Sequence, residues 1–346
     1  MGFKVENKGL LTLIQGSQRI GYQQFGVPVS GVMDSYSSRI GNILVGNDEE
    51  EACLEILMIG PKLVFDKKTK VAITGANLEA KINNIEIAMW RSYEVNKGDV
   101  LTFGNIKSGC RSYVCFAGGI DVEEVMGSKS TYTKAMLGGF EGRALKEGDY
   151  IKLGECNIDY CSVLDKKYIP IWDNEVEIRI IKGPQDDKFE NKEWEKLISS
   201  DYTVTNECDR MGYRLEGDAI KHIDGADIVS DGIAFGAIQI PGHGQPIIMM
   251  ADRQTVGGYT KIGNVISIDL HKLSQTKPGD KIRFKEVDIY SAHSLLKDYE
   301  KKFEDIKSTI STHIVLSEKR YRININGVVY DTLIEYKGEE SVAYNG

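Results

Sequence analysis

Short apolar runs separated by glycine-containing turns recur along the whole chain, and this pattern limits the folds that it can adopt. Runs of about four to eight residues between turn residues are typical of β-strands. Glycine, present 36 times among 346 residues, supplies the backbone conformations that tight turns need. Because few helical segments separate these runs, a barrel or a sandwich is favoured over alternating βαβ units. The runs interpreted as strands are 70–76, 85–90, 100–104, 112–119, 150–154, 176–183, 233–242, 246–252, 265–270 and 281–287.

Three segments have the periodicity or the capping residues of helices. The first, 37–46, follows Asp34 and Ser35, which are residue types favoured at a helix N-cap. The second is the short segment 191–200. In the third, 290–311, an apolar residue recurs every three or four positions, so that one helix face packs on the protein or on a partner. The residues of this face are Ala292, Leu296, Tyr299, Phe303, Ile306 and Ile310.

The length of the chain predicts more than one structural unit. Domains usually contain about 100–200 residues, so we expect a β-rich N-terminal domain over residues 1–165 and a second β-rich domain over residues 173–289. Residues 290–346 are expected to form a C-terminal helix plus a β-hairpin. The hairpin is predicted because an alternating pattern surrounds Asn326–Gly327, a dipeptide typical of tight hairpin turns.

The overall charge and the lack of targeting patterns argue against several classes of partner. The formal net charge is −8 and the sequence pI is about 5.4, so neither a nucleic acid nor an anionic membrane surface is expected as the main partner. No apolar stretch approaches the ~18 residues of a membrane span. The N-terminus lacks the apolar core of a signal peptide. We therefore expect a cytoplasmic protein.

Sequence motifs for metals, phosphates and biotin are not found. The six cysteines form no CxxC pair and the five histidines form no HExxH cluster, so buried inert thiols and no metal site are expected. The chain has no GxxxxGKS/T phosphate loop, no GxGxxG after a strand and no GxSxG nucleophile elbow. It also lacks an AMKM-type biotin attachment site.

Two polar segments in the first half are open to a structural or a binding interpretation. Between residues 15 and 34, Arg19 and Ser30 lie around a rigid Val-Pro-Val-Ser-Gly turn before the first helix. These residues either shape that turn or contribute to a site. In residues 118–131, a Gly-Ser-Lys-Ser-Thr run has hydroxyl and N–H groups suited to an anion, although a plain loop is the simpler interpretation.

A third polar segment, residues 205–217, is dense in charge. Arg210 has the geometry to bind a carboxylate or phosphate through two parallel hydrogen bonds. The alternative is that Asp209 and an arginine form a structural pair.

The fourth polar segment, residues 230–259, is the strongest candidate site. Its apolar strand 247–251 leads directly into charged residues, which are costly at the end of a buried strand unless they are paired or functional. Polar groups from adjacent strands that converge at strand ends are a common site geometry. A structural ion-pair network is the alternative. The polar residues concerned are Asp231, Gln239, Asp252, Arg253, Gln254, Thr255 and Tyr259.

Several segments, in a fixed order from about residue 8 to 287, resemble proteins of the allophanate hydrolase subunit 2 family. They include QGSQRIGYQQFGVPVSGVMD in the first half, and DRMGYRLEG and SDGIAFGAIQIPGHGQPIIMMADRQTVGGY in the second. This family includes the C-type subunit of bacterial 5-oxoprolinase and a bacterial protein that antagonises an inhibitor of a sporulation histidine kinase. It also includes half of the carboxyltransferase domain of urea carboxylase.

The resemblance implies a carboxyltransferase-like N-terminal domain, a cyclophilin-like β-barrel in the second half and a homologous B-type partner subunit. It also implies an ATP-dependent 5-oxoprolinase, which converts 5-oxo-L-proline, a small cyclic amide, to L-glutamate together with A-type and B-type subunits. ATP is then expected at the level of the complex. The alternatives are a regulatory protein that antagonises a B-type inhibitor, and half of a biotin-dependent carboxyltransferase, whose carrier domain this chain lacks.

Opening an amide builds negative charge on oxygen, which arginine side chains stabilise. The predicted catalytic residues are therefore Arg253 and Arg210, with Asp252 orienting Arg253 or holding a substrate N–H. Related sequences often have QDxGR where this chain has Gln15-Gly16-Ser17-Gln18-Arg19, so an aspartate is replaced by glycine, which predicts altered activity or a rebuilt pocket. The residues predicted to bind substrate are Asp231, Gln239, Gln254, Thr255, Tyr259, Arg19 and Ser30.

Overall fold

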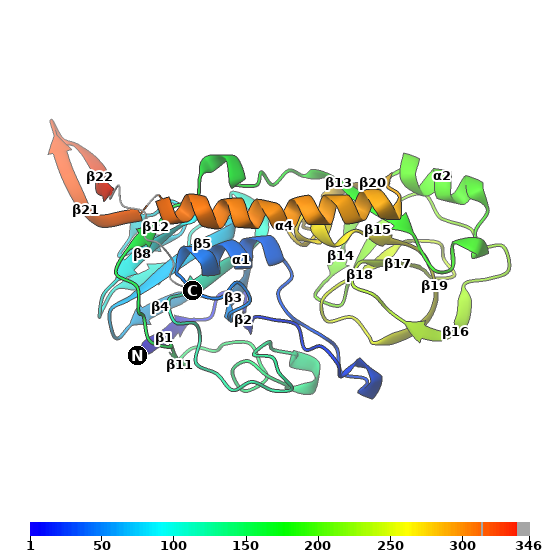
Figure 1. The fold of residues 1–346 in the computed structure, drawn as a ribbon, viewed down its shortest axis with the longest axis horizontal. Helices are drawn as coiled ribbons and strands as arrows, with labels where there is room; N and C mark the ends of the chain where they lie inside the picture. Colours follow the sequence, from blue (N-terminus) through cyan, green and yellow to red (C-terminus); the bar gives the residue numbers. More distant parts are fainter. Residues whose placement is uncertain (313, 338–346) are drawn as a thin grey trace.

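Two antiparallel sheets form the N-terminal half of the protein in a computed structural model that describes residues 1–312 and 314–337 (Figure 1). The first sheet has the order β11 (Tyr150–Lys152), β1 (Gly2–Asn7), β4 (Lys62–Phe65), β9 (Val100–Thr102), β6 (Lys81–Ile82) and β7 (Ile85–Glu86). The second has the order β2 (Leu11–Gln15), β3 (Cys53–Leu57), β10 (Ser108–Phe116), β5 (Thr69–Asn77) and β8 (Arg91–Val95).

Side chains of β10 alternate between its two faces, and each face packs against a different layer of the protein. Val114 and Phe116 point into the core between the two sheets, where they join residues of β1 and β4. Tyr113 and Cys115 point to the opposite face, as the two-residue period of a strand requires. That face is covered by α1 (Ser35–Leu44) and α4 (Ile289–Thr312).

A closed seven-stranded barrel forms the second half. Its order is β13 (Glu175–Lys182), β20 (Lys281–Glu286), β14 (Asp201–Cys208), β15 (Gly212–Glu216), β18 (Ile247–Met249), β17 (Ala237–Ile240) and β19 (Val256–Val265). Pairing of β19 with β13 closes the ring, and β16 (Asp227–Gly232) extends it beyond β19. Closure leaves no long unpaired edge in the ring. A separate apolar core fills the barrel. The expected mainly β fold with a barrel in its second half is confirmed.

Helices are few and lie outside the sheets (Figure 1). α2 (Asn191–Ser199) and α3 (Leu270–Ser274) accompany the barrel. α4 follows β20 and runs from the barrel along α1, so it spans both halves. Its Phe303, Ile306 and Ile310 are buried against the N-terminal half, so this part of the predicted apolar face packs on the same chain. The short 3-10 helices are η1 (Gln23–Phe25), η2 (Thr133–Ala135), η3 (Lys166–Tyr168), η4 (Asp186–Lys188) and η5 (Ser267–Asp269).

A β-hairpin follows α4, as predicted. β21 (Ile314–Ile325) and β22 (Val328–Lys337) pair along their length, and β21 also pairs with β12 (Cys161–Ser162). The turn residues Asn326 and Gly327 both have positive φ, 52° and 85°, which is the conformation that a two-residue hairpin turn requires.

One predicted strand is wrong. Residues 265–270 were expected to be extended, but β19 ends at Val265 and the chain continues as η5 and α3. The Asp269 carboxylate accepts hydrogen bonds from the Arg179 backbone N–H at 2.9 Å and from its guanidinium at 2.8 and 2.6 Å. This buried ion pair ties the segment back to β13, a long-range contact that outweighs the local alternation.

Candidate functional site

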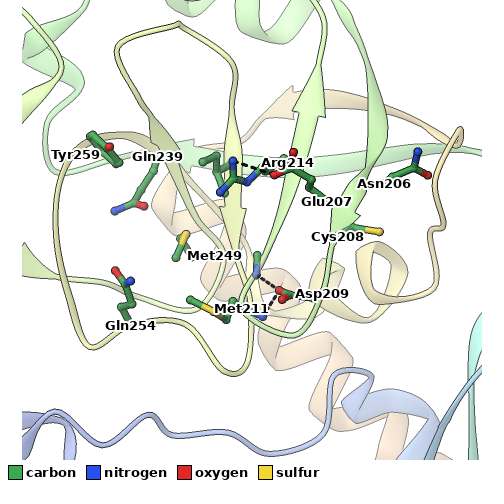
Figure 2. Close-up of a pocket in the computed structure, with 12 residues that line it drawn as sticks. Asn206, Glu207, Cys208, Asp209, Met211, Arg214, Gln239, Met249, Gln254 and Tyr259 are labelled. Carbon is green, nitrogen blue, oxygen red and sulfur yellow. Dashed lines mark hydrogen bonds and ion pairs between the residues drawn. The ribbon is translucent and has the colours of Figure 1, made fainter. Parts of the chain in front are cut away.

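A cavity of about 450 Å³ lies on the outer face of the barrel sheet (Figure 2). The strands β14, β15, β17, β18 and β19 supply most of its wall. Lys134, in η2, contacts Met211, so the N-terminal half borders the cavity. Three of the residues predicted to bind substrate, Gln239, Gln254 and Tyr259, lie in this wall. The lining residues are Asn206, Glu207, Cys208, Asp209, Met211, Gly212, Arg214, Gln239, Ile247, Met249, Gln254 and Tyr259.

Gln239 is the most informative residue of the cavity. On β17 its neighbours Ile238 and Ile240 point into the barrel core, so alternation turns Gln239 outward to the cavity. Its side chain is buried, with 5% of the residue exposed, yet its Nε2 has no hydrogen-bond partner within the described residues. A buried amide donor without an acceptor is costly, and a ligand oxygen in the cavity would remove that cost.

The rest of the cavity combines apolar and charged groups. Met211, Met249 and Ile247 give it an apolar floor. Arg214 pairs with Glu207 at 3.0 Å (Figure 2). Asp209 does not form the structural pair considered above, because its Oδ1 accepts hydrogen bonds from the backbone N–H groups of residues 211 and 212. It therefore shapes the turn between β14 and β15.

Arg210 lies at the junction between the two halves of the protein, where each of its three guanidinium nitrogens donates a hydrogen bond. Its Nε and Nη2 donate to the two carboxylate oxygens of Asp252 at 2.8 and 3.0 Å. Its Nη1 donates to Glu55 of β3 at 2.6 Å, and Nη2 also donates to the Gly31 carbonyl at 2.6 Å. All three charged side chains are buried. One guanidinium thus joins a barrel carboxylate to a carboxylate of the N-terminal half.

This ion pair continues into a buried polar network. The second oxygen of Glu55 accepts hydrogen bonds from the Met33 backbone N–H at 2.8 Å and the Tyr113 hydroxyl at 2.9 Å. Asp34 receives a hydrogen bond from Gln275, beside α3, at 2.7 Å. We call Asp34, Glu55, Tyr113, Arg210, Asp252 and Gln275 the junction network. It fixes the barrel against the N-terminal sheets through directional contacts, which an apolar interface alone does not provide.

Asp34 makes the stability of the junction depend on pH. It is the predicted N-cap of α1, with Oδ1 accepting from the Ser37 N–H at 2.8 Å. Its complete burial raises the pKa of the carboxyl from 3.8 to about 6. A raised folded-state pKa favours the protonated form, so this contribution to stability is full below pH 3.8 and is lost as the pH rises through about 6.

Asp34→Asn should therefore gain stability relative to the parent between pH 4 and pH 7, by about 3 kcal/mol at most (2.2 pH units at about 1.36 kcal/mol each). Asparagine remains a good cap. Urea unfolding of both proteins at several pH values measures the difference. The matched control is Asp288→Asn at the exposed start of α4, where hydrogen bonds with Ser291 lower the pKa, so its pH trend should have the opposite sign. If the difference in unfolding free energy between Asp34→Asn and the parent stays constant from pH 4 to pH 7, burial does not raise the pKa of Asp34.

Arg253 is a buried cation without a carboxylate partner among the described residues. Only 7% of it is exposed, and its Nε and Nη1 donate to the backbone carbonyls of Ile233 and Met250 at 2.9 and 3.3 Å. Loss of hydration lowers the pKa of Arg253 to about 10. Such an uncompensated charge is expensive. It directly precedes Gln254 of the cavity wall, whereas Asp252 bonds to Arg210 and not to Arg253.

Arg19 and Ser30 lie on the N-terminal side of the junction. Arg19 is fully buried and holds the 125–130 loop through the carbonyls of Val125 and Ser130, but its Nη1 has no partner within the described residues. Burial lowers the pKa of Arg19, and the charge of Asp252 opposes this shift. Ser30 is buried with φ of 52° and an unpartnered hydroxyl. Both therefore offer unused donors close to the junction network.

The 118–131 segment is a plain loop. The hydroxyls of Ser128 and Ser130 both donate to the Ser17 carbonyl, and that of Thr131 donates to Ile14. Gly16, where the resemblance leads us to expect aspartate, has little free space. A Cβ there would lie 3.1 Å from the Ala52 Cα and 3.2 Å from the Glu50 carbonyl oxygen.

The remaining predicted site residues lie beside the cavity. Asp231, on β16, pairs with Lys261 of β19 at 3.0 Å, and the Thr255 carbonyl accepts a hydrogen bond from Ile233. Lys261, which is only 2% exposed, was missed from the sequence, as was Glu55. The available signal for Glu55 was a charged residue inside an otherwise apolar strand. Lys261 has no such signal, because its strand also contains threonine, asparagine and glycine.

Neither a metal-binding cluster nor a membrane-spanning helix is found in the part of the chain that the structure describes. Across residues 1–312 and 314–337, no group of three or more histidine, cysteine, aspartate or glutamate side chains is arranged to hold a metal ion. In that same part of the chain, no helix has the length and apolar character needed to cross a membrane.

Comparisons with known proteins match both the sequence and the fold. The family described as "Carboxyltransferase domain, subdomain A and B" matches residues 25–286. The C-type subunit of 5-oxoprolinase from Escherichia coli is 35% identical over 88% of this chain and 97% of that protein. Its Haemophilus influenzae counterpart is 35% identical over 86% and 95%. The crystal structure of K. lactis urea amidolyase superposes with a TM-score of 0.83 at 32% identity, over 88% of this chain and a fifth (20%) of that chain.

Proposed function

Because this chain belongs to the carboxyltransferase domain family, subdomains A and B, we propose that it is the C-type subunit of an ATP-dependent 5-oxoprolinase. The complex would convert 5-oxo-L-proline, ATP and water to L-glutamate, ADP and phosphate, with A-type and B-type subunits as partners. The support is that the two bacterial C-type relatives match this chain over nearly their whole length. Urea amidolyase, in contrast, contains this fold as one part of a much longer chain.

The cavity suits a cyclic amide. Gln239 donates its free N–H to the ligand carbonyl oxygen, and Gln254 and Tyr259 orient the ring over the methionines. Lactams resist attack because resonance delocalises the nitrogen lone pair, so ring opening places negative charge on the carbonyl oxygen. Arg253 supplies a nearby positive charge that no carboxylate of the described residues neutralises, and such charges stabilise a developing oxyanion.

The two other residues predicted to be catalytic have a supporting role in this proposal. Arg210 pairs with both Asp252 and Glu55. The two residues therefore position the segment that carries Arg253, after β18, through the junction network. Arg19 and Ser30 have unused donors on the other side of the junction, but both residues are fully buried, so we assign them no contact with substrate or partner.

The cavity does not suit a triphosphate. Its lining contains two carboxylates, Glu207 and Asp209, and its arginine is already paired. Triphosphate sites instead need several unpaired donors or cations. We therefore assign ATP to another part of the complex.

The observation that carries the proposal is the unpartnered amide of Gln239, and Gln239→Leu tests it. Loss of one hydrogen bond to the ligand should raise the KM for 5-oxo-L-proline about tenfold in the complex of all three subunits. Steady-state ATP hydrolysis that depends on 5-oxo-L-proline is the measurement. The control is Gln245→Leu, which removes a barrel glutamine bonded to Gly217 outside the cavity and should leave KM unchanged. An unchanged KM in Gln239→Leu would remove the main support for this cavity as the substrate site.

The second candidate is half of a biotin-dependent carboxyltransferase, which the similarity to urea amidolyase favours. That function needs a biotinylated carrier on a partner chain. Purification of the chain with its natural partners and detection with streptavidin distinguishes the two. We expect ATP hydrolysis driven by 5-oxo-L-proline and no biotinylated partner. A biotinylated partner together with no response to 5-oxo-L-proline would favour the carboxyltransferase.

A further inference from the structure

We propose that Arg214 recognises a carboxylate on the ligand and that Glu207 occupies Arg214 until the ligand replaces it. The ligand class is then a cyclic amide that bears a carboxylate next to the ring. This inference rests on the proposed function, because it assigns the second end of the same ligand. It assigns a role in specificity to Arg214, which the sequence showed only as part of the charge-dense segment 205–217.

Strand register places Arg214 and Gln239 on either side of one residue. Arg214 of β15 and Gln239 of β17 are both paired with Ile247 of β18. Paired residues of neighbouring strands point to the same face, so the three side chains form a row across the outer face of the barrel. Because adjacent strands lie about 4.8 Å apart, the two polar side chains start about 10 Å apart. Figure 2 shows both side chains in the cavity wall, with Met249 below them in this view.

This spacing matches a small ligand with two polar ends. In Figure 2 the Arg214 guanidinium turns toward Glu207 and the Gln239 amide points away from it, and the cavity of about 450 Å³ has room for one five-membered ring. Gly212 keeps this space open, since a Cβ there would lie 3.3 Å from Ile247 and 3.6 Å from the Met249 sulfur. A ring carbonyl on the Gln239 side therefore puts a ring carboxylate on the Arg214 side.

The ion pair that holds Arg214 is easily exchanged. The side chains of Arg214 and Glu207 are 55% and 70% exposed, and their contact is a single distance of 3.0 Å. Exposed pairs of this kind contribute little to stability. A ligand carboxylate in the cavity is less hydrated and can accept two parallel hydrogen bonds from the guanidinium. Among the lining residues that the structure describes, Arg214 is the cation. We therefore infer that it distinguishes an anionic ligand from a neutral one.

The test compares 5-oxo-L-proline with 2-pyrrolidinone, which has the same ring without the carboxylate. Binding of each is measured by calorimetry to the assembled complex, with the parent chain and with three variants. In Arg214→Gln the dissociation constant for 5-oxo-L-proline should rise about tenfold or more, while that for 2-pyrrolidinone should change less than about twofold. Glu207→Gln frees Arg214, so it should bind 5-oxo-L-proline about two- to fivefold more tightly, with no change for 2-pyrrolidinone.

The matched control is Arg283→Gln, because Arg283 forms a comparable exposed pair with Asp201 on the barrel, at 2.6 Å and outside the cavity. It should leave both dissociation constants unchanged. If Arg214→Gln weakens both ligands equally, or neither, the inference is overturned while lactam binding by the parent still supports the proposed function. If the parent complex binds neither ligand, the proposed function fails and this inference fails with it. Thermal unfolding of each variant confirms that the exposed substitutions leave the fold intact.

Discussion

Arg210→Ala should lower the free energy of unfolding by about 3–5 kcal/mol. The physical reason is that the substitution leaves two carboxylates, Glu55 and Asp252, buried and without their shared cation. It also removes the hydrogen bond to the Gly31 carbonyl. Since Glu55 belongs to the N-terminal half and Asp252 to the barrel, the substitution weakens the contact between the two halves. Urea unfolding followed by tryptophan fluorescence and circular dichroism measures it.

A matched control and a rescue make this prediction specific. Arg214→Ala removes an exposed arginine on the adjoining strand and should change the free energy of unfolding by less than about 1 kcal/mol. The triple variant Arg210→Met, Glu55→Gln and Asp252→Asn should recover most of the loss, because burying neutral groups costs less than burying unpaired charges. An unfolding midpoint for Arg210→Ala equal to that of the parent would show that the junction network does not hold the two halves together.

Arg253→Met should reduce kcat of the assembled complex about 10²–10³-fold, with KM changed by less than about threefold, if Arg253 acts on charge that develops only in the transition state. Its stability should change little, within about 1 kcal/mol, because the hydrogen bonds lost to two backbone carbonyls are offset by removal of an uncompensated buried charge. This combination of normal stability and poor turnover is the opposite of what a structural ion pair would give.

Two further variants complete this test. Arg179→Met removes a barrel arginine that is paired with Asp269, so it should lose stability and keep kcat. Arg253→Lys retains a positive charge and should recover part of the turnover lost in Arg253→Met. Near-normal kcat in Arg253→Met, in a complex that hydrolyses ATP with 5-oxo-L-proline, would exclude Arg253 from the chemistry and leave the cavity residues to account for it.

Much of the fold was readable from local patterns. The apolar run 112–119 predicted a strand, and its first part belongs to β10. Asp34 was one of two residues identified as suited to cap the first helix, and it is the N-cap of α1. Asn326–Gly327 predicted the hairpin turn. The strand predicted at 265–270 was wrong although apolar and polar residues alternate there. The Arg179–Asp269 ion pair holds this segment as a turn and a helix. A prediction from local sequence patterns fails where a contact with a distant residue stabilises a different local structure.

Local patterns were enough to predict short strands, the positions of turns and helix caps, and a cluster of polar residues after the strand 247–251. They could not predict which of those polar residues pair with each other and which line the cavity. Arg210 and Asp252 are joined to Glu55, which is 155 residues from Arg210, while Gln239 and Arg214 flank Ile247 across a cavity. The reason is that a residue's partners across strands depend on pairing register and on how two cores dock, and neither leaves a signal in the local periodicity of the chain.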